Sequence, residues 1–296
     1  MAFKDQSYDS SDRHVSPSEI GRKLGLDEKT VRVRVNKMEG DGFIKYYQAS
    51  PSLALFGLNC LNLYRFETLN IATKRRVIEH LESVPGVVAL FDYLGPVVSM
   101  NMAGTSPEEN RLIVEDVAKK FELSKIKLGE RIFRAPLTRL DRLDWQIIQK
   151  LRYNARGSTK DIAEALSITP RLVEYRIARL IATNVLLIRA VIDTQKQQGL
   201  IFYELEMTSD QADYSLVLRE LSETFKEKMW SSQKTVGGVL FINLFGFTLG
   251  EPEEAAMRAL NQRGVRSCSL LIRKEEIEPR RPNWLDSLIE QKIGGS

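Results

Sequence analysis

Residues 158–182 carry the pattern that most constrains the fold of this chain, two short helices separated by a tight turn. We expect the second helix to begin at Thr169 and Pro170. Threonine can accept hydrogen bonds from the first free amides, and proline is tolerated at the first helical position because its missing N–H would be unpaired there. The apolar residues of this helix recur at i, i+4 and i+7: Val173, Ile177 and Leu180. One apolar stripe with a polar outward face indicates a helix-turn-helix motif.

The same pattern occurs earlier in the chain. Leu24 and Leu166 are 142 residues apart, and at this offset Asp27 matches Thr169 as the cap of the second helix. The core positions also coincide, with Val31, Val35 and Met38 matching Val173, Ile177 and Leu180. No gap is needed between Ser16 and Gly57. A shared core pattern over this length predicts an internal duplication.

The residues that flank the two helix pairs are less alike. Residues 43–47 read as a wing strand, and residues 185–192 are the place for a wing hairpin. Residues 143–151 form a helix with a clear apolar face, whereas its counterpart within residues 1–15 is mostly polar. We therefore expect the first helix of the first copy to be short, frayed or missing, with another part of the chain covering its half of the core.

Two further stretches, 53–135 and 198–275, each read as strand, helix, strand, strand, helix, strand. The expected strands are 56–66, 87–94, 97–103, 125–133, 200–207, 230–236, 239–247 and 265–273, and the expected helices are 71–81, 107–121, 211–225 and 251–261. This order is ferredoxin-like, an antiparallel sheet with two helices on one face. The predicted fold class is α+β. Two winged helix-turn-helix units, 1–50 and 139–192, alternate with the two ferredoxin-like (βαββαβ) domains, and a tail, 276–296, follows.

Length and composition limit the number of domains and the location that we expect for the protein. Its 296 residues suit two domains, or more if they are small. It has no run of eighteen apolar residues and no apolar signal segment at its start, so we expect a cytoplasmic protein without a membrane span. Cys60 and Cys268 lie at unrelated positions and cannot by themselves form a disulfide framework or a zinc site. The net charge of +4 is compatible with nucleic acid without being diagnostic.

The start of the second copy resembles a known family. The passage 140–148, Leu-Asp-Arg-Leu-Asp-Trp-Gln-Ile-Ile, with Asn154, Ala155 and Arg156, is similar to the start of the Lrp/AsnC (feast/famine) transcription regulators, and so is the order of domains. The chain resembles two such regulators fused in tandem, as in some archaeal proteins. The resemblance implies regulation of transcription on double-stranded DNA, homodimers formed through the ferredoxin-like sheets and a small-molecule effector. The first copy departs at its first helix, where His14 matches Arg156.

The outward faces of the two second helices are the candidate DNA contacts. The candidates are Lys29, Thr30, Arg32, Arg34, Asn36 and Lys37 in the first copy, and Arg171, Tyr175, Arg176 and Arg179 in the second. Arginine and asparagine can bond to guanine and adenine edges, and lysine can neutralise phosphates. A solvated helix surface is the alternative. Glu174 lies on the second face and repels phosphate, so we expect the first copy to contribute more. The second copy could instead be a structural module.

Other candidates belong to helix starts and hairpins. Arg156 and Thr159 precede or begin a helix, where phosphate contact and plain helix capping are both open. The candidate effector contacts lie in the hairpins of the ferredoxin-like domains: Asp92, Leu94, Gly95, Gly237 and Gly238. Glycine lets a ligand approach the backbone closely, and simple turn chemistry is the alternative. Apolar residues on the uncovered sheet faces predict that sensor domains pair face to face, within the chain or across a homodimer.

A different class of function is an enzyme. Chains similar to paired Lrp/AsnC proteins also occur in tetrapyrrole decarboxylation, which relies on histidine and basic residues beside a large pocket. This chain has only His14 and His80, and no catalytic triad, metal cluster or phosphate loop is recognisable. We therefore expect no enzyme activity and no cofactor. A third alternative is an adaptor that oligomerises with other regulators without binding DNA.

Overall fold

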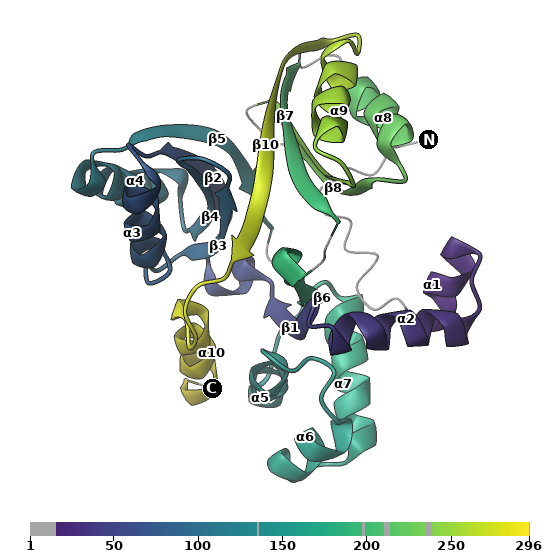
Figure 1. Ribbon diagram of the computed structural model, residues 1–296. Helices are drawn as coiled ribbons and strands as arrows, with labels where there is room; N and C mark the ends of the chain where they lie inside the picture. The colour runs from purple at the N-terminus through teal and green to yellow at the C-terminus, as the bar shows by residue number, and fades with distance from the viewer. Residues whose placement is uncertain (1–15, 135, 197–198, 210–213, 235–237, 296) are drawn as a thin grey trace. The chain divides into compact units, whose positions relative to one another are not determined.

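The computed structural model describes residues 16–134, 136–196, 199–209, 214–234 and 238–295 (Figure 1). The expected first helix within residues 1–15, together with His14 and Gly237, lies outside the described residues. The chain divides into two compact units. The helix-turn-helix unit contains residues 16–57, 134–196 and 282–295, and the sheet unit contains residues 58–133 and 199–281. Each unit is described by itself.

The helix-turn-helix unit contains the two predicted helix pairs. Its first part consists of α1 (Pro17–Leu24), α2 (Glu28–Gly40), β1 (Ile44–Pro51) and the 3-10 helix η2 (Leu53–Phe56). Its second part consists of α5 (Arg142–Leu151), α6 (Thr159–Leu166), α7 (Pro170–Ala182), β6 (Leu186–Ile192) and η3 (Thr194–Lys196). The expected caps form, since Asp27 accepts a hydrogen bond from the amide of Thr30 and Thr169 accepts one from the amide of Leu172.

The two wing strands pair with each other. β1 and β6 form an antiparallel two-stranded sheet, so the expected wing hairpin is wrong. Each copy supplies one strand, whose sheet partner is the strand of the other copy, and β1 also forms backbone hydrogen bonds to Arg152 and Ala155. Tyr47 pairs with Ala190 and Gln48 pairs with Arg189. Tyr47 and Arg189 are 142 residues apart, as are Gln48 and Ala190, so the register is symmetric about its own centre.

The last helix, α10 (Trp284–Gly294), belongs to the helix-turn-helix unit instead of forming a separate tail. It packs against α5 and buries Leu285 and Ile289 in a core shared with Trp145 and Ile148. The side chain of Asp286 accepts hydrogen bonds from Arg152 (2.9 Å) and from the hydroxyl of Tyr153 (2.5 Å). The C-terminal helix is thus fixed by apolar packing and by a half-buried carboxylate.

The sheet unit contains two runs of strand, helix, strand, strand, helix, strand. The first consists of β2 (Cys60–Glu67), α3 (Ile71–Leu81), β3 (Val87–Tyr93), β4 (Val97–Gly104), α4 (Pro107–Phe121) and β5 (Ser124–Ile132). The second consists of β7 (Ile201–Ser209), α8 (Tyr214–Phe225), β8 (Met229–Lys234), β9 (Val239–Gly246), α9 (Gly250–Leu260) and β10 (Val265–Ile277). Together the strands form one antiparallel sheet in the order β5-β2-β4-β3-β10-β7-β9-β8.

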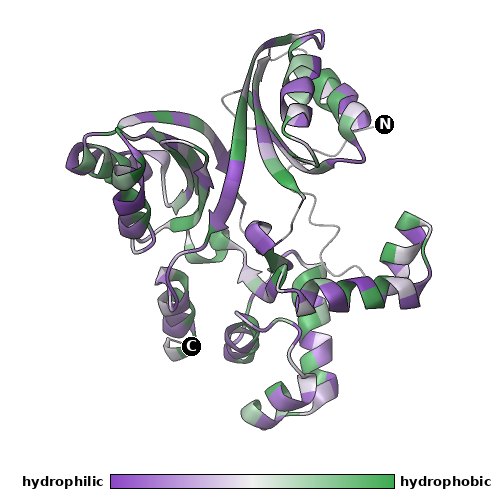
Figure 2. Ribbon diagram, in the orientation of Figure 1, coloured by the Kyte–Doolittle hydropathy of each residue, from purple (hydrophilic) through white to green (hydrophobic). Residues whose placement is uncertain are grey.

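A seam between β3 and β10 joins the two runs. β10 has 13 residues, whereas the corresponding strand β5 has nine. Its additional residues extend past the expected end at Arg273 and pair with β3, where Glu276 lies opposite Phe91 and Ile277 opposite Leu90. Figure 2 shows this end of β10 as hydrophilic. Backbone pairing between β3 and β10 at this seam joins the strands of the two ferredoxin-like runs into one sheet.

The faces of the sheet that lie away from the helices contact each other within the chain. Leu63 of β2 and Leu128 of β5 pack against Phe241 of β9. Polar contacts accompany them, because Arg65 pairs with Glu206, while Glu204 accepts hydrogen bonds from the hydroxyl of Tyr93 (2.9 Å) and from Arg273 (3.0 Å). The expected face-to-face pairing therefore takes place inside one chain.

No described helix combines the length and the apolar character that a membrane span requires. Both cysteines are free thiols; Cys60 is buried and Cys268 is half-buried. Burial, together with the nearby carboxylate of Glu206, raises the pKa of the Cys268 thiol to about 11. Both cysteines are thus weakly reactive packing residues.

Candidate nucleic-acid interface

Helix α2 presents a row of polar side chains to solvent. Val31 is buried and Val35 and Met38 are half-buried, so these three fix the inner face of the helix. The outer face is exposed and carries Lys29, Arg32, Arg34, Asn36 and Lys37. Lys29, Arg34 and Lys37 form no ion pair with another described residue. Five of the six residues of this helix that were predicted to contact DNA are therefore exposed to solvent.

Two side chains of α2 have partners within the helix. Arg32 pairs with Glu28 at 2.6 Å, but both side chains are largely exposed, and such a pair contributes little and can exchange for a phosphate or a base. Thr30 differs, since its hydroxyl donates to Asp27 at 2.6 Å within the helix cap. This hydrogen bond also lowers the pKa of Asp27. Thr30 is thus a capping residue, which corrects its prediction as a DNA contact.

Helix α7 offers a smaller reading face than the sequence suggests. Arg171 and Tyr175 are exposed, and 63% of the Tyr175 surface is accessible. Glu174 is also exposed and accepts a hydrogen bond from the hydroxyl of Thr159 at 3.2 Å. Thr159 therefore joins the start of α6 to α7, which is a structural contact instead of the predicted phosphate contact.

Arg176 and Arg179 point back into the second helix-turn-helix. Arg176 bonds to Asp141 (2.6 Å) and to Asp144 (3.0 Å), and Arg179 bonds to the other oxygen of Asp144. Asp144 is fully buried, and it also accepts a hydrogen bond from the amide of Asp141 in a capping box at the start of α5. The two guanidinium groups compensate this buried carboxylate. Their prediction as DNA contacts is therefore corrected: they hold α7 against α5.

Arg156 connects the two helix-turn-helix motifs. Its guanidinium bonds to Glu39 near the end of α2 at 2.8 Å and lies 3.8 Å from the centre of the Tyr47 ring. The hydroxyl of Tyr47 donates to the same carboxylate at 2.7 Å. Arg156 thus has a partner within the unit, and its phosphate contact stays a prediction. No local pattern indicates Glu39 as the partner, because the two residues are 117 positions apart.

The turns of the two motifs differ at one matched position. Gly25 ends α1 with a φ of 66°, and Ser167 ends α6 with a φ of 55°, so both occupy the left-handed region. This region is unfavourable for residues that carry a Cβ atom. The second turn therefore carries strain that the first turn avoids.

We expect Ser167→Gly to raise the free energy of unfolding of the second motif by roughly 0.5–1 kcal/mol, because glycine adopts this conformation without steric cost. Hydrogen exchange of the α6 and α7 amides measures the change. Ser167→Ala, which retains the Cβ atom, is the matched control. Equal slowing of exchange by both substitutions would contradict the role of the backbone conformation.

The hairpin residues that were predicted as effector contacts have partners within the sheet unit. Asp92 is buried and pairs with Lys74 (2.6 Å) and Lys274 (2.9 Å). The ammonium group of Lys74 also donates to the carbonyl oxygens of Tyr93 and Gly95, so this lysine occupies the inside of the hairpin. The amide of Leu94 donates to the carbonyl oxygen of Ile272 in the seam. Each of these three predicted residues therefore has a structural partner, and an effector contact at this hairpin stays a prediction.

Gly238 also has a packing explanation. Its φ is 88°, and a Cβ atom there would lie 2.2 Å from the hydroxyl oxygen of Tyr214. The glycine thus makes room for the tyrosine that begins α8. Gly237 lies outside the described residues. The alternative of turn chemistry therefore accounts for Gly238 better than an effector contact.

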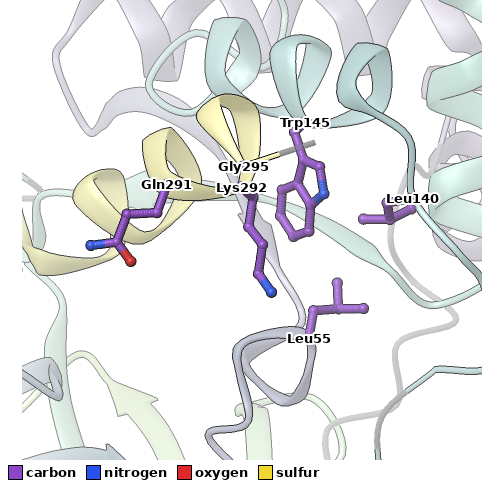
Figure 3. Close-up of a pocket in the computed structure, with 6 residues that line it drawn as sticks. All are labelled: Leu55, Leu140, Trp145, Gln291, Lys292 and Gly295. Carbon is purple, nitrogen blue, oxygen red and sulfur yellow. The ribbon is translucent and has the colours of Figure 1, made fainter.

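A hollow of about 540 Å³ lies within the helix-turn-helix unit, between α5, α10 and η2. Leu55, Leu140 and Trp145 supply its apolar wall, and Gln291, Lys292 and Gly295 line the side formed by α10. Figure 3 shows the side chains of Trp145 and Lys292 pointing into it. Among the described residues, no group of histidine, cysteine and acidic side chains could hold a metal ion. The hollow thus combines an apolar wall with the amide of Gln291 and the ammonium group of Lys292.

Comparison with family models defines the class of these motifs. Residues 140–181 match the AsnC-type helix-turn-helix domain, and residues 10–45 match a winged helix-turn-helix DNA-binding domain. The chain therefore contains winged helix-turn-helix domains, the second of AsnC type. A search of the curated proteins gives no significant match.

Similar solved structures cover this chain to different extents. Two are crystal structures of the siroheme decarboxylase NirDL. The one in co-complex with an iron-uroporphyrin III analogue is 15% identical, covers 97% of this chain and 99% of its own, and has a TM-score of 0.57. The other is 16% identical, covers 94% and 93%, and has a TM-score of 0.58. The structure of Escherichia coli AsnC is 19% identical and covers 47% of this chain and 94% of its own, with a TM-score of 0.38.

Proposed function

We propose that this protein is a sequence-specific DNA-binding regulator of transcription of the Lrp/AsnC type. The observation that carries the proposal is the exposed row of cations and amide on α2, within a motif that matches a winged helix-turn-helix DNA-binding domain. Cations neutralise phosphates, while Arg32 and Asn36 can bond to base edges. Affinity and specificity then come from one helix face.

The proposal includes an origin by tandem fusion of two copies. The offset of 142 residues, found in the helix-turn-helix sequences, also relates the strands β4 and β9, because Val97–Gly104 and Val239–Gly246 differ by this number at both ends. The two six-element runs and the symmetric β1–β6 register support the same interpretation. We further propose a cytoplasmic location, where a regulator meets its DNA.

Variants of α2 test DNA binding. We expect Arg32→Ala and Asn36→Ala each to cost ~1–3 kcal/mol at the specific site and to relax base preference. Lys29→Ala and Lys37→Ala should weaken binding to all sequences alike, each lowering the salt slope by about one. Affinities measured at two salt concentrations provide both quantities. Lys119→Ala, an exposed cation on α4, is the control and should change neither.

We expect Arg171→Ala on α7 to matter less than Arg32→Ala. With Arg176 and Arg179 bound to Asp144, α7 retains a single outward arginine, and Glu174 opposes phosphates beside it. Removal of this repulsion by Glu174→Ala should raise non-specific affinity. If Arg171→Ala abolishes binding while Arg32→Ala leaves it intact, the second motif contributes more to DNA binding than the first, and this prediction is wrong.

A tetrapyrrole decarboxylase is the second candidate, favoured by the shared fold with NirDL over nearly the full length of both chains. His80, the histidine that the structure describes, gives the decarboxylase candidate little support. His80 lies on α3, where its ring contacts Phe121 (5.4 Å between centroids), and burial together with Lys120 lowers its pKa. We therefore propose a non-enzymatic role. Addition of siroheme to the purified protein tests this, since a change of its absorbance spectrum and release of carbon dioxide would establish the enzyme instead.

Regulation by a small-molecule effector at the ferredoxin-like domains is a separate part of the proposal. Since Lys74 and Tyr214 explain the two hairpins, an effector would need other residues of the sheet unit. DNA affinity measured with each common amino acid in turn tests the idea. An adaptor that binds other regulators but no DNA would leave every genomic fragment unshifted in a gel.

A further inference from the structure

We propose that one chain binds one operator made of two different half-sites, so that its DNA target is not a palindrome. This inference rests on the proposed DNA-binding function. It begins from the pairing of β1 with β6, which joins the two helix-turn-helix motifs inside a single chain. The register is symmetric about the pairs Tyr47–Ala190 and Gln48–Arg189. A symmetric junction relates α2 and α7 as the two recognition helices of a dimer are related, without a second chain.

The contact between Arg156 and Glu39 fixes this arrangement further. Arg156 belongs to the second motif and Glu39 to α2 of the first, and their ion pair is covered on one side by the ring of Tyr47. Together with the strand pair, it limits how far the two motifs can separate. A fixed separation of the motifs requires a fixed spacing between the half-sites.

The two recognition helices carry different side chains at five matched outward positions, whereas Arg34 matches Arg176, which is bound to Asp141 and Asp144. The pairs at the offset of 142 are Lys29 and Arg171, Arg32 and Glu174, Val33 and Tyr175, Asn36 and Ala178, and Lys37 and Arg179. Of these, Arg179 is bound to Asp144 and is withdrawn from the surface of α7. At matched positions, α2 thus has a cation where α7 has an acid (Arg32 and Glu174), and an amide where α7 has a methyl group (Asn36 and Ala178).

These differences predict different base preferences. In the first half-site, Arg32 can bond to guanine and Asn36 to adenine. In the second, Ala178 offers only apolar contact, which suits the methyl group of thymine, and Arg171 can bond to guanine. Since the two helices contact DNA in related orientations, identical half-sites would leave one helix with mismatched partners. Each mismatched base pair costs about 1–3 kcal/mol, which is about 5- to 160-fold in affinity.

Selection from random duplexes tests the inference. We use the full chain and a library of about 31 random base pairs, long enough for three helical turns. The expected consensus has two dissimilar half-sites at one fixed spacing, bound by one chain per duplex. Insertion of about five base pairs between them turns the half-sites to opposite faces of the DNA and should reduce affinity at least tenfold.

A grafted variant provides the matched comparison. The substitutions Arg171→Lys, Glu174→Arg, Tyr175→Val and Ala178→Asn give α7 the outward residues of α2, while Arg176 and Arg179 remain to hold Asp144. The variant should select a palindrome of the first half-site, and it should bind the original operator more weakly. Circular dichroism and exchange rates of the α7 amides confirm that the helix is intact.

The outcomes separate the inference from the proposed function. If no sequence is enriched and no duplex is bound, DNA binding itself fails. If the native chain selects a palindrome, or two chains occupy each operator, DNA binding stands and the single-chain operator is wrong. A consensus with one half-site only would also overturn it, since α7 would then read no bases.

Discussion

Asp144→Asn should lower the free energy of unfolding of the second helix-turn-helix by about 3 kcal/mol. The carboxylate is fully buried and compensates two guanidinium groups, those of Arg176 and Arg179. Asparagine preserves the shape and can still serve the capping box, but Arg179 loses its ion-pair partner and Arg176 retains only the exposed carboxylate of Asp141. Because 19% and 31% of the two arginine side chains are exposed, water recovers a part of the loss, and the lower end of the range for buried pairs applies.

Hydrogen exchange of the amides of α5 and α7 measures this effect directly, because the chain has two compact units and a single unfolding transition cannot be assumed. Asp141→Asn is the matched control. Its side chain is 53% exposed, and asparagine caps a helix as well as aspartate, so the cost should stay below about 1 kcal/mol. Equal effects of the two substitutions would show that charge compensation does not fix α7 to α5.

Ile289→Ala should destabilise the helix-turn-helix unit by roughly 2–5 kcal/mol. Ile289 is fully buried on α10 and packs in the core that contains Trp145 and Ile148 of α5. Truncation removes apolar contacts and leaves a cavity that rigid neighbours fill only in part. Faster exchange of the α5 amides, with a shift of tryptophan fluorescence, would report the change.

The exposed neighbour provides the control for this helix. Glu290→Ala removes a side chain on the outer face of α10 and should leave exchange of the α5 amides within about 0.5 kcal/mol of the native value. If Ile289→Ala is equally mild, α10 lies against α5 without stabilising it, and the C-terminal helix has no part in the core.

The elements with strong local signals were predictable from the sequence. The capped helices α2 and α7 and the order of strands and helices in the sheet unit all appear near their expected positions. Their signals lie within a few residues, such as Asp27 three positions before Thr30, or apolar residues one helical turn apart. The winged helix-turn-helix class follows from the same local features.

The partners of these elements were not predictable. β1 has a strand pattern, but nothing local indicates that its neighbour is β6, more than a hundred residues away. In the same way, the positions of Arg176 and Arg179 on α7 are those expected for outward residues, and only the buried Asp144 on another helix turns them inward. Charged residues on a helix face are therefore ambiguous until the neighbouring helices are placed.

The partners of the predicted effector residues were not predictable for a related reason. Asp92 and Gly95 belong to a hairpin, and the sequence does not show which group occupies its inside. The structure shows that this group is the ammonium of Lys74, which comes from α3. Lys74 has a helical position that gives no indication of burial. A buried lysine bound to backbone carbonyls and a carboxylate becomes visible only in three dimensions.

The strand pair β1–β6 also governs which partnerships can arise in a cell. If the two halves were separate polypeptides with equivalent strands, each could join its own kind as well as the other, and like and unlike pairs would compete. Because the two halves are covalently linked, each first half lies close to a second half, and this favours the unlike pair. The ratio of the two halves is fixed at one to one, whatever the expression level. Each half is then free to diverge in its recognition helix, because a change on one side is never paired with a copy of itself.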